Sequence, residues 1–235
     1  MIVVLANQWD QVARAFAARW PEHNIRVLTP QDLSRSGWRQ RLGDGRGSTV
    51  VVDGEQVPQS EITGVLTRLP CVHEEDLGEI AASDRAYVAA EMMAFLWHWL
   101  SSLRCPVINR PSSTCLTGPG WRREAWVRAA ASVGITVLPV RRHVSRSEAD
   151  IAEEVRDTFT VSVLGDSVVG CDDNNLRQSV RRLSRLADVD YLSARFSSAE
   201  PHARLLDVDV FPDLSDDRIS ALLLDYLQPR AVACP

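Results

Sequence analysis

The apolar residues near the N-terminus change their spacing within a short stretch. Residues 2–6 form a fully apolar run, which is typical of a strand that is covered on both faces. From Trp9 the apolar residues recur three or four positions apart, as on one face of a helix, and Pro21 ends this pattern. Residues 25–28 are a second apolar run. The order strand, helix, strand predicts the start of an open parallel sheet.

The first half of the chain continues this α/β pattern. Further strands are expected at residues 49–52, 55–57, 62–69 and 105–109. Asp53-Gly54 lies between the first two of them and is a favoured two-residue hairpin turn. Residues 83–103 are apolar nearly all round, which predicts a long helix at the centre of the first domain's packing.

The second half has a different order of elements. Helices are expected at residues 121–133, 147–156, 176–186 and 215–227, and strands at 159–164, 167–171, 191–196 and 204–211. Ser215 is the expected N-cap of the last helix, with Asp216 and Asp217 in its first turn. These elements predict an antiparallel sheet with helices, and therefore a second lobe with a seam near the loop at residues 110–120.

Composition narrows the class of protein. The 235 residues carry a formal net charge of −5 and are 45% hydrophobic, so we expect no nucleic-acid partner held by bulk positive charge. The most apolar stretch, residues 86–103, contains Glu91 and His98, which predicts a buried helix and no membrane span. The five cysteines are widely spaced and lack a C-x-x-C motif, which argues against a disulfide framework and favours a reducing compartment. We therefore expect a cytoplasmic protein.

The basic residues exclude several chemistries. All 26 of them are arginine, so the chain has no Schiff-base lysine, no pyridoxal-phosphate anchor and no P-loop lysine. The first turn, at residues 7–10, contains no glycine, so the dinucleotide-binding fingerprint is missing. The histidines have no metal-binding spacing, and no Cys–His pair is identifiable from spacing.

Arg68 is the first candidate for ligand binding. It lies at the end of a predicted strand, at the edge where open α/β sheets bind ligands, and its guanidinium can hold a carboxylate or a phosphate. The alternative is an ion pair with Asp84 or Glu91. A carboxylate buried alone is costly, so we expect Glu91 to have a partner, with Arg68 as the candidate. Asp84 and Arg85 either contribute to binding or cap and charge the start of the long helix.

The loop at the predicted seam is the second candidate. Asn109 and Arg110 follow a strand, and the loop leads to the N-terminus of the helix at residues 121–133. A helix N-terminus binds anions readily, and Arg122 would add positive charge there. The alternative is a bare connection between the lobes.

Two acidic groups are candidates for metal binding. Asp207 and Asp209 lie two positions apart on a predicted strand, so both carboxylates share one face and can hold Mg²⁺. The alternative is a solvated outer face of the strand. Residues 172–175 are also polar, but they lack the glycine and the distal glutamate of a calcium loop, which predicts a turn and a helix N-cap.

Several strings of residues resemble the ATP-grasp carboxylate–amine ligases, particularly those related to ribosomal-protein glutamylases and peptide macrocyclases. They lie at residues 84–95 (Asp84-Arg85-Ala86-Tyr87, Glu91 and Phe95), 105–111, 134–139, 159–166 and 206–212, the last where the family carries its magnesium-binding Glu-x-Asn. The resemblance implies an α/β protein with a parallel-sheet pre-ATP-grasp-like domain over residues 1–115 and a reduced α+β ATP-grasp-like lobe over residues 116–235.

The chain departs from this family at the nucleotide site. The family supplies lysines to the phosphates from its first nucleotide-binding lobe, but only about 20 residues separate Pro139 from Phe159 here, which is room for one strand and one helix. Where the family carries a metal-binding aspartate on the preceding strand, residues 193–195 offer no carboxylate. The second lobe is therefore expected to lack most of the lysine-bearing subdomain.

Two functions follow from these observations. In the first, the chain is a degenerate ATP-grasp homologue without a cofactor, which binds a peptide or amino-acid-like molecule or a partner biosynthetic enzyme. In the second, it is a minimal ligase that depends on ATP and magnesium, or an enzyme with ATP-independent chemistry in the former substrate cleft. We favour the first, because arginines alone would have to neutralise a triphosphate. Loss of a covering lobe exposes apolar surface, so we also expect a homodimer.

Overall fold

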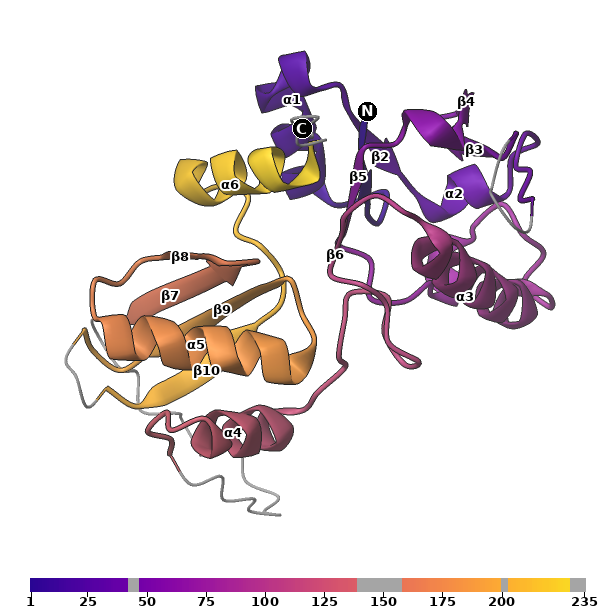
Figure 1. The fold of residues 1–235 in the computed structure, drawn as a ribbon. Coiled ribbons are helices and arrows are strands. Elements are labelled where there is room, and N and C mark those ends of the chain that lie inside the picture. Colours follow the sequence, from indigo (N-terminus) through magenta and orange to yellow (C-terminus); the bar gives the residue numbers. More distant parts are fainter. Residues whose placement is uncertain (42–46, 139–157, 200–202, 229–235) are drawn as a thin grey trace. The chain divides into compact units, whose positions relative to one another are not determined.

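The chain folds into two compact units (Figure 1). The computed structural model describes residues 1–41, 47–138, 158–199 and 203–228. One unit is Met1–Gly118 together with Asp213–Pro235, and the other is Pro119–Pro212. The C-terminal helix therefore belongs to the first unit, whereas the predicted boundary after residue 115 left it in the second. The helix expected at residues 147–156 lies outside the described residues.

A four-stranded parallel sheet forms the centre of the first unit. Its strands are β1 (Ile2–Leu5), β2 (Ile25–Leu28), β5 (Gly64–Thr67) and β6 (Val107–Ile108), in the order β2-β1-β5-β6. β1 pairs in parallel with both β2 and β5, and β5 pairs with β6. Helix α1 (Gln11–Arg19) connects β1 to β2. The predicted β-α-β opening is confirmed, and β1 is fully buried, as its unbroken apolar run predicts.

The predicted hairpin in this unit is also confirmed. β3 (Thr49–Val52) and β4 (Glu55–Pro58) pair antiparallel around Asp53 and Gly54. Both turn residues have a positive φ, 52° and 77°, which is the conformation that a two-residue turn of this kind requires. The short helices of the unit are α2 (Pro30–Leu33) and the 3₁₀ turns η1 (Pro21–His23), η2 (Gln59–Glu61) and η3 (Glu74–Asp76).

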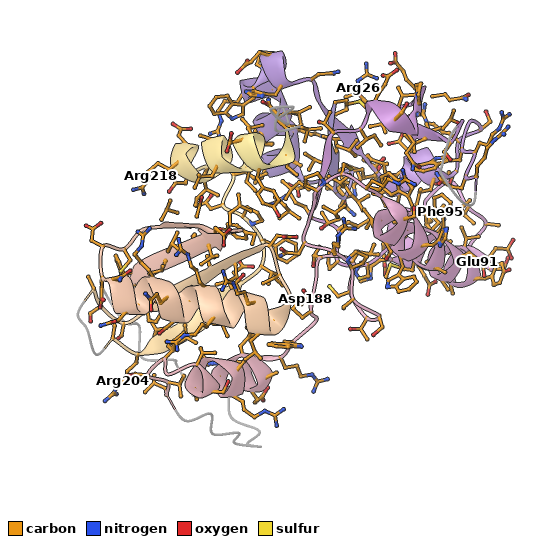
Figure 2. All side chains as sticks on the ribbon, in the orientation of Figure 1. Arg26, Glu91, Phe95, Asp188, Arg204 and Arg218 are labelled. Carbon is orange, nitrogen blue, oxygen red and sulfur yellow. The ribbon has the colours of Figure 1, made fainter. Side chains whose placement is uncertain are left out.

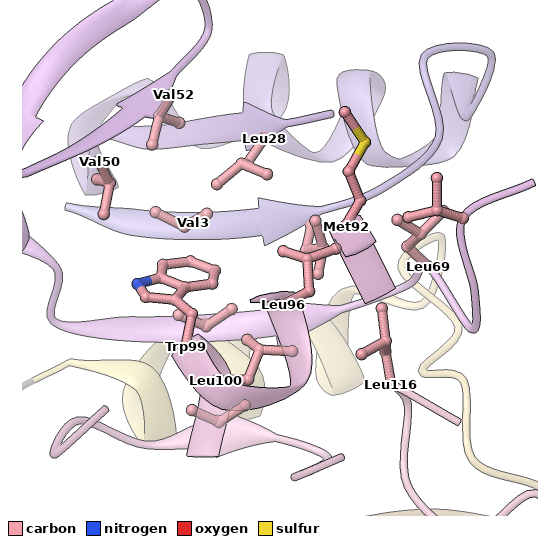
Figure 3. Close-up of a cluster of buried hydrophobic side chains, with 14 of the residues drawn as sticks. Val3, Leu28, Val50, Val52, Leu69, Met92, Leu96, Trp99, Leu100 and Leu116 are labelled. Carbon is pink, nitrogen blue, oxygen red and sulfur yellow. The ribbon is translucent and has the colours of Figure 1, made fainter. Parts of the chain in front are cut away.

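Helix α3 (Arg85–Ser102) packs with one side only. Its buried residues are Ala89, Met92, Leu96, Trp99 and Leu100, and they join side chains of the sheet and the hairpin in one hydrophobic cluster (Figure 3). Tyr87 is 69% exposed and Trp97 is 45% exposed on the other side. The expected long helix at the centre of the packing is confirmed, but only one side of it is buried, and a uniformly apolar sequence does not say which side meets the sheet. No helix among the described residues is long and apolar enough to cross a membrane.

Helix α6 (Asp217–Leu227) packs on β5 of the first unit. A Cβ atom added at Gly64 would lie 2.6 Å from the carbonyl oxygen of Leu227, so this close approach requires glycine. Arg19 of α1 donates to the carbonyl of Leu214 and to Oγ of Ser220, and pairs with Asp217 at 3.2 Å. The N-cap is Asp216, whose Oδ1 accepts from the amide of Arg218, and not Ser215 as predicted.

The second unit is an antiparallel sheet with two helices. The strands are β7 (Phe159–Leu164), β8 (Ser167–Val169), β9 (Tyr191–Phe196) and β10 (Leu205–Asp209), in the order β10-β9-β7-β8. Helices α4 (Arg123–Ser132) and α5 (Asn174–Ala187) pack against each other and against the sheet. Asp173 caps α5 by accepting from the amide of Asn175, which confirms the predicted turn and N-cap at residues 172–175.

Candidate functional site

Arg68 lies where expected, immediately after β5, at the C-terminal edge of the parallel sheet. Its Nε donates to Oδ2 of Asp10 at 2.8 Å, and each side chain is 15% exposed. The other carboxylate oxygen of Asp10 accepts from the amide of Ala13 and caps α1. One carboxylate therefore joins the end of β5 to the start of α1. The ion-pair partner of Arg68 is thus Asp10, and the predicted pairing with Asp84 or Glu91 is wrong.

The three candidates at the start of α3 have local roles. Glu91 is exposed and projects from α3 (Figure 2), so it does not need the buried partner that we expected. Asp84 is exposed at the N-cap and accepts a hydrogen bond from Oγ of Ser83. Arg85 donates to the carbonyls of Ile80 and Gly78, so it holds the preceding loop against the helix.

Asn109 and Arg110 separate after β6. Asn109 is buried, with 1% of its surface exposed, and its carbonyl accepts from Oγ1 of Thr67 at 3.0 Å. Arg110 donates to the carbonyls of Leu100, Leu103 and Cys105, at the C-terminal end of α3. A guanidinium at this place satisfies carbonyls that the helix leaves open and complements the helix dipole. The adjacent strands β5 and β6 therefore bring Arg68 and Asn109 to the same edge, whereas Arg110 is engaged by α3.

The same edge contains polar residues that the sequence analysis missed. Asp76 is 5% exposed, and its carboxylate accepts hydrogen bonds from the side chain of Asn7 and from the amide of His73. The backbone carbonyl of Asp76 accepts a further one from the side chain of Gln31. Asn7 lies two positions after the end of β1, and this place at the C-terminal edge of a parallel sheet was the signal that could have found it. Asp76 follows no strand, so its place here depends on tertiary structure.

A thiol and an imidazole lie close together beside this cluster. Sγ of Cys71 is 3.0 Å from Nε2 of His73. The two residues are only two positions apart in the sequence, and this spacing did not mark them as a pair. Burial raises the pKa of the Cys71 thiol, and Cys115 and Asp76 raise it further through their negative charge. The thiol is therefore held in its protonated form, which is the opposite of what a nucleophilic cysteine needs.

Arg122, Asp207 and Asp209 lie in the second unit. Arg122 is the exposed N-cap residue of α4. Asp207 lies opposite Arg195 of β9, with a guanidinium nitrogen 3.7 Å from its Oδ2, and Asp209 lies opposite Ser193. Both carboxylates also accept backbone amides, from Val208 and Phe211.

These residues do not fit a magnesium ion well. Mg²⁺ takes hard oxygen ligands in octahedral geometry, whereas here a guanidinium nitrogen of Arg195 lies 3.7 Å from one of the two carboxylates, on the strand where a further carboxylate was expected. Across the part of the chain that the structure describes, no group of three or more histidine, cysteine, aspartate or glutamate side chains is arranged to hold a metal.

Comparisons with known proteins were made by sequence and by structure. No family model matches the chain, and no curated protein matches its sequence. Solved structures do match. A RiPP-associated ATP-grasp ligase from Chryseobacterium gregarium, in complex with ADP and a leader and core peptide, is 12% identical over 96% of this chain and 96% of that chain, with a TM-score of 0.63. The chain has an ATP-grasp-like fold.

Two further ligases support the same fold. The macrocyclase MdnC from Microcystis aeruginosa MRC, bound with precursor peptide MdnA, is 7% identical over 96% of this chain and 98% of that chain, with a TM-score of 0.64. The ATP-grasp ligase PsnB, complexed with minimal precursor, Mg and ADP, is 16% identical over 96% of each chain, with a TM-score of 0.63. The ATP-grasp resemblance found in the sequence is confirmed at the level of the fold.

Proposed function

We propose that this chain is a degenerate ATP-grasp homologue without an intact ATP site. In this role it binds a peptide or amino-acid-like molecule, or a partner enzyme, in a peptide or amino-acid-derived biosynthetic pathway. The observation that carries the proposal is Arg195, which lies opposite Asp207 at the position expected to carry magnesium ligands. An ATP-grasp ligase needs carboxylates there to hold the cation that bridges the phosphates.

The charge of the chain supports the same proposal. The sequence contains no lysine, so any phosphate contact would have to come from arginine or from backbone amides. Arg195 pairs with the exposed carboxylate of Asp207. Arg177, Arg181 and Arg185 of α5 bind the carbonyl of Cys171, the carbonyl of Asp166 and the side chain of Asp166, respectively. The basic face of α5 therefore stabilises the β7–β8 hairpin.

Peptides are the ligand class that the similar structures favour. The Chryseobacterium ligase, MdnC and PsnB were all solved with a leader, core or precursor peptide. A homologue that had lost its nucleotide site could still bind such a peptide. A homodimer is part of this proposal, since the aromatic residues on the open side of α3 offer apolar surface to a second copy.

The second candidate is a minimal ligase that uses ATP and magnesium. The specific observation in its favour is that the similar structure of PsnB holds Mg and ADP. Such a ligase would require arginines to take over the whole phosphate site.

Calorimetric titration with ATP and Mg²⁺ separates the two candidates. We expect no heat from the wild-type chain at millimolar nucleotide. Magnesium-dependent binding that is lost in Asp207→Ala and kept in Asp225→Ala, an exposed aspartate of α6, would overturn the proposal and establish the ligase. Binding that both variants keep would also overturn it, and would place the nucleotide away from Asp207.

A further inference from the structure

A cavity of about 410 Å³ lies beside β2, the outer strand of the parallel sheet. It is formed by the first unit alone, from β2, α1, α2 and the turn between β3 and β4. Its polar lining includes three arginines, two aspartates and one glutamine that the argument uses: Arg14, Arg26, Arg35, Asp32, Asp53 and Gln31. These residues are separate from the site around Arg68. Gln31 alone among them connects the two regions, because its side-chain amide donates to the carbonyl of Asp76.

The wall formed by β2 presents unpaired backbone groups. The carbonyls of Asn24 and Leu28 accept amides from the β1 side, and in a parallel ladder the inward-facing residues alternate with outward-facing ones. The amides and carbonyls of Ile25 and Val27 therefore point away from β1. Among the described residues β2 pairs with β1 alone, so this edge is open. An open strand edge is a template for pairing with another extended chain.

Three guanidinium groups surround this edge. Arg14 donates a hydrogen bond to the carbonyl of Gln8, and Arg26 donates one to the exposed carboxylate of Glu55 at 2.7 Å. Arg35 lies over the hairpin turn, where a Cβ added at Gly54 would be 2.5 Å from its Nη1. Each guanidinium has five N–H donors, so most of them are not used by the contacts described.

Acidic groups offset part of this charge. Asp32, which is 3% exposed, accepts from Thr29 and from the amide of Gly54, and its Oδ1 also lies 4.0 Å from Nε of Arg35. Asp53 lies at the exposed tip of the turn. The carboxylate of Glu55 is 68% exposed, so solvent weakens its pair with Arg26, and a ligand carboxylate can compete for the same guanidinium.

We propose that this cavity binds an extended peptide segment with acidic side chains, which pairs with the open edge of β2. The backbone of the peptide bonds Ile25 and Val27, and its carboxylates contact Arg14, Arg26 and Arg35. Oε1 of Gln31, a lining residue of the cavity, is buried and has no hydrogen-bond partner in the described part of the chain, which leaves an acceptor for an amide of the peptide once the side chain turns toward the cavity. This inference deepens the proposed function, because it names a site and a class for the peptide ligand.

Fluorescence anisotropy with two labelled peptides tests the inference. The probe is Glu-Val-Glu-Val-Glu, and the matched control is Gln-Val-Gln-Val-Gln, which has the same length and backbone without the charges. We expect the acidic probe to bind at least ~10-fold more tightly, since one charge-assisted hydrogen bond contributes about that factor. The difference should shrink as salt is raised.

Variants of the chain separate the backbone contacts from the charges. Arg26→Gln and Arg14→Gln should each weaken binding roughly 3–10-fold, whereas Arg185→Gln, an equally basic position on α5 of the other unit, should leave it unchanged. Val27→Pro removes an amide that faces the open edge and spares the ladder to β1, so it should abolish binding. If Val27→Pro does not fold, N-methylation of alternate amides of the probe removes the same pairing.

The possible outcomes separate this inference from the proposed function. Tight binding of the acidic probe that Arg26→Gln and the loss of backbone pairing both weaken supports the site. Binding that neither change affects overturns it and leaves a peptide-binding function elsewhere on the chain. No difference between the acidic and amide probes also overturns it. The nucleotide titration tests the proposed function independently of all these results.

Discussion

The ion pair between Asp10 and Arg68 offers a direct test of whether the sheet edge serves the fold or a ligand. We consider the change Asp10→Asn, because asparagine caps a helix about as well as aspartate and would keep the bond from the amide of Ala13. The change then removes only the charge that faces Arg68. Both side chains are largely buried, at 15% exposure each, so solvent screens the pair weakly.

The expected size of the effect follows from this geometry. Arg68 has further interactions besides Asp10, so the loss corresponds to one charged hydrogen bond and not to an isolated buried charge. We therefore expect Asp10→Asn to lower the free energy of unfolding by about 1.5–3 kcal/mol, measured by urea denaturation. Arg68→Met should cost a similar amount, and the double variant should show a coupling energy of about 1–2 kcal/mol.

The opposite result would refute a structural role for the pair. If Arg68→Met left the unfolding free energy within about 0.5 kcal/mol of wild type, the guanidinium would contribute nothing to the fold. Arg68 would then be held in place for a ligand, and the first interpretation of its position at the sheet edge would stand. Coupling near zero, together with two destabilising single changes, would mean that each residue acts through other contacts.

Three further predictions concern packing and titration. Gly64→Ala should destabilise the chain by about 1–3 kcal/mol in urea denaturation, because its methyl group would meet Leu227, whereas Gly78→Ala, with open space around it, should stay within about 1 kcal/mol of wild type. Cys71 should react with iodoacetamide more slowly at neutral pH than free cysteine, since burial raises the pKa of its thiol. The pKa of Asp216 is lowered mainly by the hydrogen bond from the side chain of Arg218. The stability that Asp216 contributes is therefore present above the ordinary aspartate pKa and is lost as the pH falls through the lowered pKa. Arg218→Gln should raise the pKa of Asp216 toward the ordinary aspartate value, as measured by an NMR titration. An unchanged Asp216 titration would contradict this cause.

The sequence predicted the elements well wherever the local pattern is decisive. The unbroken apolar run of β1, the period of α1 and the turn at Asp53-Gly54 each depend on a few neighbouring residues, and each is confirmed. Local chemistry was less decisive at helix starts. Ser215 and Asp216 are both good N-cap residues, and the structure uses Asp216.

The contacts between distant segments could not be predicted in this way. Arg68 has Asp10 within reach because β1 and β5 are neighbours in the sheet, and nothing in the spacing of 58 positions indicates that. Glu91 seemed to need a partner because the helix around it is otherwise apolar, and the pattern did not show that Glu91 lies on the exposed side. The same limit applies to α6, whose place on β5 depends on the missing side chain of Gly64.

The two polar regions of the first unit differ in how their charges are used. At the C-terminal edge of the sheet, the Nε of Arg68 is bound by a carboxylate and Arg110 is bound by the end of α3. A ligand at this edge must displace contacts that already stabilise the fold, so its net binding free energy is small. Beside β2, in contrast, the carboxylate of Glu55 that binds Arg26 is exposed, and among the described residues the outer edge of the strand is open. A chain that has lost its nucleotide site but still binds acidic peptides would therefore hold them at the β2 edge, and the affinity of Arg26→Gln would fall while that of Arg68→Met stayed constant.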